Sequence, residues 1–97
     1  MENKQHYDIC KVNSKGVMHK YVSDYFPFEL KEVVWENEWD IAYPKVDIYD
    51  GGIVVGTPED YYGNKQGYRL VVAPVELNIN PLDYVNLEEL RKESEQL

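Results

Sequence analysis

Near the N-terminus, two strand-like runs lie on either side of a turn sequence. Residues 7–12 (Tyr-Asp-Ile-Cys-Lys-Val) and 17–22 (Val-Met-His-Lys-Tyr-Val) are joined by Asn-Ser-Lys-Gly at 13–16. Asparagine suits the first position of a type I turn, and glycine adopts the positive φ of the bulge that follows such a turn. The pattern predicts an antiparallel hairpin whose successive side chains alternate between two faces. Tyr7 and Ile9 are expected on one face, and Cys10 and Val12 on the other.

The stretch from 33 to 43 alternates in the way that is typical of a half-buried strand. Five of its six odd-numbered positions are apolar, and three of its five even-numbered positions are acidic. A helical stripe through residues 30–41 fits less well, because it leaves both tryptophans off the stripe. We therefore expect a strand that ends at Pro44. Eleven residues is long for a single strand, so a turn at 36–38 is the alternative. The acids expected to face water are Glu36, Glu38 and Asp40.

Glycine and proline divide the next part of the chain into short segments. Residues 45–49 and 53–55 predict two strands, joined by a turn with the sequence Asp-Gly-Gly. Residues 56–68 contain three glycines and a proline and predict a long loop. Such a loop is uncommon unless it has a role. Strand character resumes over 69–77, with an interruption at Pro74.

Two asparagines mark the starts of helical segments near the C-terminus. Asn80 precedes a proline, and Asn86, with Glu89 three residues later, resembles a capping box. The chain therefore predicts an α+β fold. We expect a small twisted antiparallel β-sheet, made of the N-terminal hairpin and further strands, with one C-terminal α-helix over one face or edge. Residues 1–97 are expected to form a single compact domain.

Acidic and aromatic residues are concentrated in the middle of the chain. The formal net charge is -8, and residues 24–60 hold ten acids against two lysines. Ten of the thirteen aromatic residues lie between positions 21 and 62. Such a surface repels phosphates and suits a basic protein partner, although exposed acids also serve simply to keep a domain soluble. No apolar run approaches the roughly 20 residues that a membrane span needs.

No combination of residues specifies an active site or a cofactor. Cys10, His6 and His19 lack the spacing of metal ligands, and the single cysteine excludes an internal disulfide and fits a reducing cytosol. The glycines match no dinucleotide-binding or phosphate-binding motif. The carboxylates are too numerous for any pair to be singled out. The sequence therefore predicts a cytoplasmic, non-enzymatic protein with no metal, no cofactor and no direct contact with nucleic acid or membrane.

These features favour a small acidic protein-binding module of the inhibitor, immunity or adaptor type, such as phages and mobile elements carry. We expect it to dock on a basic partner surface through residues 24–62, and mimicry of nucleic acid is one version of this. The candidate partner-binding residues are Glu36, Glu38, Asp40, Trp35, Trp39, Tyr61 and Tyr62. Whether both tryptophans pack in the core, or one is an exposed anchor, stays open. A small-molecule-binding domain and a structural subunit of a larger assembly are the alternative functions. Self-association into a homo-oligomer also stays open.

Overall fold

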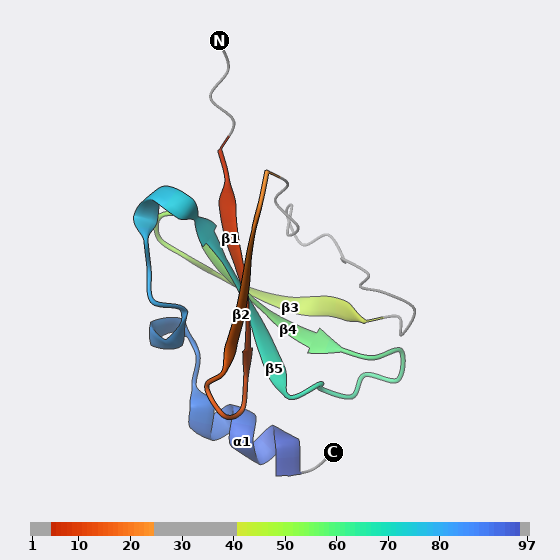
Figure 1. Cartoon of the computed structure of the whole chain (residues 1–97). Coiled ribbons are helices and arrows are strands. Elements are labelled where there is room, and N and C mark those ends of the chain that lie inside the picture. The colour runs from red at the N-terminus through yellow and green to blue at the C-terminus, as the bar shows by residue number, and fades with distance from the viewer. Residues whose placement is uncertain (1–4, 25–40, 96–97) are drawn as a thin grey trace.

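The computed structural model describes residues 5–24 and 41–95. They form a twisted, open, antiparallel sheet of five strands in the order β2-β1-β5-β4-β3, followed by a helical segment (Figure 1). The strands are β1 (Tyr7–Asn13), β2 (Met18–Ser23), β3 (Ala42–Tyr49), β4 (Ile53–Glu59) and β5 (Tyr68–Pro74). Two 3₁₀ helices, η1 (Val75–Leu77) and η2 (Pro81–Tyr84), lead to the helix α1 (Leu87–Glu95). The expected α+β fold with one C-terminal α-helix is confirmed.

The N-terminal hairpin forms as the turn sequence predicts. The Asn13 side-chain oxygen accepts hydrogen bonds from the backbone N–H groups of Lys15, at 2.9 Å, and Val17, at 3.0 Å. Gly16 has a φ of 77°, which is the left-handed conformation that the bulge requires. The register then runs without interruption along β1 and β2. Local turn chemistry therefore determines the pairing of these two strands.

β3 runs through Pro44, so the expected strand end at that proline is wrong. The pairing of β3 with β4 has an irregularity in register between Ala42 and Lys45, and the proline lies within it. β3 is also an edge strand, where a proline N atom need not donate to a neighbouring strand. Of the strand expected over 33–43, only positions 41–43 are among the described residues, and positions 33–40 lie outside them.

β4 continues to Glu59, well beyond its expected end. Gly56 pairs inside the sheet with both neighbouring strands, and Pro58 lies past the last residue pair with β5. Neither residue therefore has to break the strand, and the loop expected over 56–68 shortens to 60–67. The turn before β4 is as expected, with positive φ at both of its glycines. β5 ends at Pro74, so the strand character expected beyond it, to residue 77, is wrong: the 3₁₀ helix η1 occupies Val75–Leu77.

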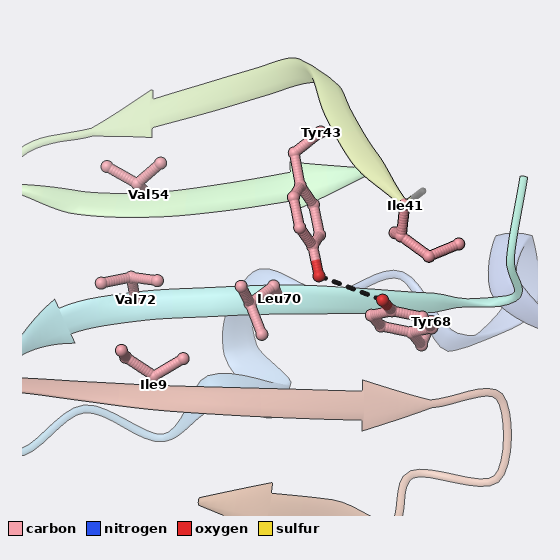
Figure 2. Close-up of a cluster of buried hydrophobic side chains, with 7 residues drawn as sticks. All are labelled: Ile9, Ile41, Tyr43, Val54, Tyr68, Leu70 and Val72. Atoms are coloured by element: carbon pink, nitrogen blue, oxygen red, sulfur yellow. Dashed lines mark hydrogen bonds between the residues drawn. The ribbon is translucent and has the colours of Figure 1, made fainter. Parts of the chain in front are cut away.

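One face of the sheet, here called the first face, carries a cluster of buried apolar side chains (Figure 2). The hydroxyl groups of Tyr43 and Tyr68 hydrogen-bond to each other at 3.0 Å within it. This pair joins β3 to β5 across β4 and satisfies two polar groups that burial would otherwise penalise. The cluster consists of Ile9, Ile41, Tyr43, Val54, Tyr68, Leu70 and Val72.

The C-terminal segment covers the opposite face, here called the second face (Figure 1). Cys10 and Val12 are buried there, as the strand alternation predicts. Both predicted caps form: the Asn80 side chain accepts from Leu82 N at 3.2 Å, and the Asn86 side chain accepts from Glu89 N at 3.1 Å. The segment packs on the sheet through Ile79, Leu82, Tyr84, Val85 and Leu87. No helix within residues 5–24 and 41–95 has the length and apolar character to cross a membrane.

Candidate functional site

The carboxylate of Asp60 is the centre of the hydrogen bonds within the loop between β4 and β5. This carboxylate accepts hydrogen bonds from Tyr62 N and Asn64 N, both at 2.9 Å, and from Asn64 Nδ2 at 3.2 Å. Backbone hydrogen bonds close the same turn, from Asp60 N to Asn64 O and from Gly63 N to Asp60 O, each at 3.0 Å. Gly63 has a φ of 82°, a backbone conformation that residues other than glycine rarely adopt. The loop is therefore an ordered turn.

A second set of contacts ties the loop to the end of β4. Gln66 N donates to Pro58 O at 3.2 Å, and the Gln66 side chain donates to Asn64 O at 2.8 Å. Glu59 and Lys65 form an isolated antiparallel bridge. These contacts extend the order of the sheet into the loop.

Asp60 also gives the loop a stable negative charge. The backbone N–H of Asn64 is the main cause that lowers the pKa of this carboxyl, and the hydrogen bonds from the Asn64 side chain and the Tyr62 N–H add to it. Hydrogen bonds that favour the charged form keep a carboxylate ionised. Asp60 is therefore an anion at neutral pH.

The ordered loop presents two tyrosines to solvent. Tyr61 is 75% exposed and Tyr62 is 84% exposed, and both rank among the exposed large hydrophobic residues. Their rings lie edge to face, with centroids 5.4 Å apart and an interplanar angle of 88°. This geometry is favourable for an aromatic pair. The two predicted anchor residues are thus side by side and accessible.

A hollow of about 570 Å³ lies beside the tyrosine pair on the first face of the sheet. The Lys11 Nζ atom lies 4.1 Å from the centroid of the Tyr68 ring in its wall, which is a cation–π contact. The Tyr68 hydroxyl is fixed by Tyr43, as Figure 2 shows. The described residues that line the hollow are Lys11, Ile41, Asp60, Tyr61, Tyr62, Gln66 and Tyr68. They offer aromatic surface, one ammonium group and one carboxylate, which are groups for binding.

The structure brings together two of the seven sequence-predicted site residues, Tyr61 and Tyr62. The other five, Glu36, Glu38, Asp40, Trp35 and Trp39, lie outside the described residues. The sequence did not single out Lys11 or Tyr68, because β1 and β5 become neighbours only through the sheet topology. The alternation of side chains along a strand predicts on which face of the sheet Lys11 and Tyr68 lie. It does not predict that they lie close to the β4–β5 loop.

Arg69 is a further residue that the sequence analysis missed. It is buried on the second face, where its guanidinium hydrogen-bonds to both carboxylate oxygens of Glu93 in α1 and to the Tyr68 carbonyl. It lines a smaller cleft of about 140 Å³ between the sheet and the C-terminal segment, together with Thr57 and Lys45. One feature of the sequence could have identified it: Arg69 is the single charged residue in the apolar run 68–74. Such a charge requires a partner.

The cysteine and histidines are not brought together into a reactive site. Cys10 is fully buried in the core of the second face, and this burial raises the pKa of its thiol. Within residues 5–24 and 41–95, no three histidine, cysteine or carboxylate side chains are grouped so as to hold a metal ion.

Comparison with known proteins does not assign the chain to a class. No protein-family model, curated protein or solved structure matches it. Its function must therefore be argued from the tyrosine pair, the hollow and the charge of the chain.

Proposed function

We propose that this chain is a small non-enzymatic protein-binding module that docks on a basic partner surface. Tyr61 and Tyr62 serve as its anchors, and the acids of residues 24–60 attract the partner. The observation that carries the proposal is the hydrogen-bonded loop, which presents two largely exposed tyrosines whose rings lie edge to face. An inhibitor, an immunity protein or an adaptor would each use such a surface.

Exposed tyrosines are suited to this role because they bury a large area at low conformational cost. Tyrosine is enriched among the residues that dominate binding energy at protein interfaces. Here the hydrogen bonds of Asp60 order the backbone around the pair before any partner arrives. Ordering a loop on binding costs free energy, so a loop that is already ordered leaves more of the contact energy as affinity.

The charge of the chain supplies the preference for a basic partner. The net charge is -8, and the acidic excess lies in residues 24–60, next to the loop in sequence. Long-range attraction between opposite charges raises association rates and discriminates against acidic partners. Asp60 adds a carboxylate that is ionised at neutral pH beside the two rings.

The hollow supports a second candidate function, the binding of a small molecule. Its volume of about 570 Å³ is within the range of ligand sites, and three of its lining residues are tyrosines. In that case Tyr68 and Lys11 would contact the ligand, and Tyr61 and Tyr62 would form the rim. A partner side chain inserted beside the tyrosine pair would use the same hollow.

Affinity capture from native cell extract, followed by mass spectrometry, tests the proposal and separates the two functions. The full chain is compared with the Tyr61→Ala/Tyr62→Ala variant and with Leu77→Ala, which removes an exposed apolar side chain from η1, outside residues 24–62. We expect a protein that the wild type and Leu77→Ala retain and the double variant loses. Retention that weakens as salt rises supports electrostatic docking. Equal retention by all three chains contradicts the proposal, and a bound metabolite without a protein favours the second function.

A further inference from the structure

Among residues 5–24 and 41–95, the outer edge of β2 is a row of backbone hydrogen-bonding groups that no other strand pairs with. β2 is the last strand of the sheet on the hairpin side (Figure 1). The hydrogen bonds between β1 and β2 determine which residues of β2 direct their backbone N–H and C=O groups away from the sheet. Asn13 N donates to Val17 O at 3.1 Å, so this residue pair is hydrogen-bonded, and every second pair along the hairpin is too.

Because hydrogen-bonded and non-hydrogen-bonded pairs alternate along the hairpin, three residues of β2 direct their backbone groups outward. Met18, Lys20 and Val22 lie at the non-hydrogen-bonded positions opposite β1, so their N–H and C=O groups point away from the sheet. The pairing of β1 with β5 is consistent with this assignment. Val75 N donates to His6 O at 3.0 Å, so the even-numbered residues of β1 form their backbone hydrogen bonds with β5. Its odd-numbered residues are therefore the ones that bond to β2. Within residues 5–24 and 41–95, no strand pairs with this outer edge.

The side chains along the same edge are apolar and exposed. Val17, Met18 and Val22 all rank among the exposed large hydrophobic residues of the described chain. They lie on or directly before a strand with an uninterrupted register and without proline. The opposite edge differs, because β3 carries Pro44 and an irregular register there. Proline and bulges are common ways of protecting an edge from pairing with another chain, and β2 has neither.

The local charge indicates what the edge would accept. Residues 7–23 hold three lysines and one aspartate, in a chain whose net charge is -8. Lys20 lies at the centre of the three outward positions and is exposed. Antiparallel pairing of β2 with the same strand of a second copy, centred on Lys20, would place the two Lys20 side chains opposite each other, which is unfavourable for like charges on paired strands. An extended segment that carries acids would meet opposite charge.

We propose that β2 binds an extended acidic segment of a protein partner as a sixth strand of the sheet. The backbone groups of Met18, Lys20 and Val22 supply up to three donors and three acceptors, and the lysine selects for acidic residues. This surface is separate from the β4–β5 loop, so the inference goes beyond the function proposed above and does not depend on it.

Hydrogen exchange of individual amides tests the proposal directly. The full chain, labelled with ¹⁵N, is studied by NMR alone and with a capped peptide of alternating valine and glutamate. The amides of Met18, Lys20 and Val22 should exchange rapidly in the free protein and should slow by about tenfold with the peptide bound. The matched peptide with lysine in place of glutamate should leave them fast.

Two variants isolate the backbone group and the charge. Lys20→Pro removes the central outward N–H and should abolish the slowing. Lys20→Glu keeps the backbone and should reverse the preference between the peptides, which remains informative if the proline variant does not fold. Lys92→Glu makes the same charge change at an exposed position on α1 and should behave as the wild type.

Three results would overturn the proposal. One is an acidic peptide that leaves the three amides fast. Another is equal slowing by both peptides, which would remove the role of charge. The third is slowing that grows with protein concentration without any peptide, because the occupant would then be a second copy of the chain.

Discussion

Arg69 of β5 and Glu93 of α1 form a buried ion pair between the sheet and the helix. Both side chains are 9% exposed, and the guanidinium contacts both carboxylate oxygens. The Arg69 Nη2 atom is also 3.5 Å from Glu89 Oε1, but that side chain is 55% exposed. One arginine thus has a buried and an exposed acidic partner on the same helix, one turn apart.

These two partners should differ sharply in their effect on stability. We expect Glu93→Ala to lower the free energy of unfolding by about 3 kcal/mol, because it leaves a buried guanidinium without its counter-charge. Glu89→Ala should cost about 1 kcal/mol or less, as for exposed ion pairs. Urea denaturation of the two variants measures both values, and equal losses would show that the buried contact has no special weight.

The same pair should make stability depend on pH in the acidic range. The hydrogen bond from Arg69 lowers the pKa of Glu93 below its ordinary value of 4.5. A carboxyl with a lowered pKa in the folded state contributes stability that is full above its unfolded pKa. That contribution is lost as the pH falls through the folded pKa. The stability difference between the wild type and Glu93→Gln should therefore shrink as the pH falls below about 4.5. A difference that stays constant from neutral pH to pH ~3 would contradict this.

Cys10 should be unreactive in the folded protein. It is fully buried, and the raised pKa of its thiol leaves little thiolate, which is the reactive form. A thiol reagent at neutral pH should label it slowly in the native state and rapidly in urea. Rapid labelling without denaturant would mean that the second face opens far more readily than its packing indicates.

Much of the fold follows from local signals in the sequence. The asparagine and glycine of the hairpin turn, and the asparagines that cap η2 and α1, act within a few residues of themselves. Their effect does not depend on the rest of the fold. The two interior prolines did not follow the local expectation. Pro44 and Pro58 lie inside strands because each avoids a position where a neighbouring strand needs its N–H, and only the sheet order determines those positions.

The candidate site was predictable to a similar extent. Two adjacent tyrosines in a loop are visible in the sequence, and both are exposed. The hollow beside them also needs Lys11 and Ile41, which come from different strands and are far apart in the chain. The ion pair of Arg69 likewise joins residues 24 positions apart. Contacts of this kind depend on tertiary packing, which periodicity and capping do not encode.

The acids of residues 24–60 should act mainly on the rate of association. Reversal of Glu36, Glu38 and Asp40 to lysine adds two positive charges per residue and changes the net charge of the chain from -8 to -2. Because long-range attraction steers encounters, we expect association with the basic partner to slow while dissociation changes little. Stopped-flow kinetics at low salt measures this. An unchanged association rate would show that the acids serve only to keep the chain soluble.

The dissociation rate of the partner complex tests the role of Tyr61 and Tyr62 most directly. Binding kinetics are measured for the wild type, for each single alanine variant and for Leu77→Ala as a control outside residues 24–62. The exposed tyrosines should contribute little to folding, so unfolding free energies should stay within about 0.5 kcal/mol of the wild type. We expect each tyrosine variant to dissociate about tenfold faster or more, with little change in association, since truncation of an anchor residue acts mainly on dissociation. Dissociation rates that match the wild type in both tyrosine variants would contradict the proposal that this pair anchors the partner.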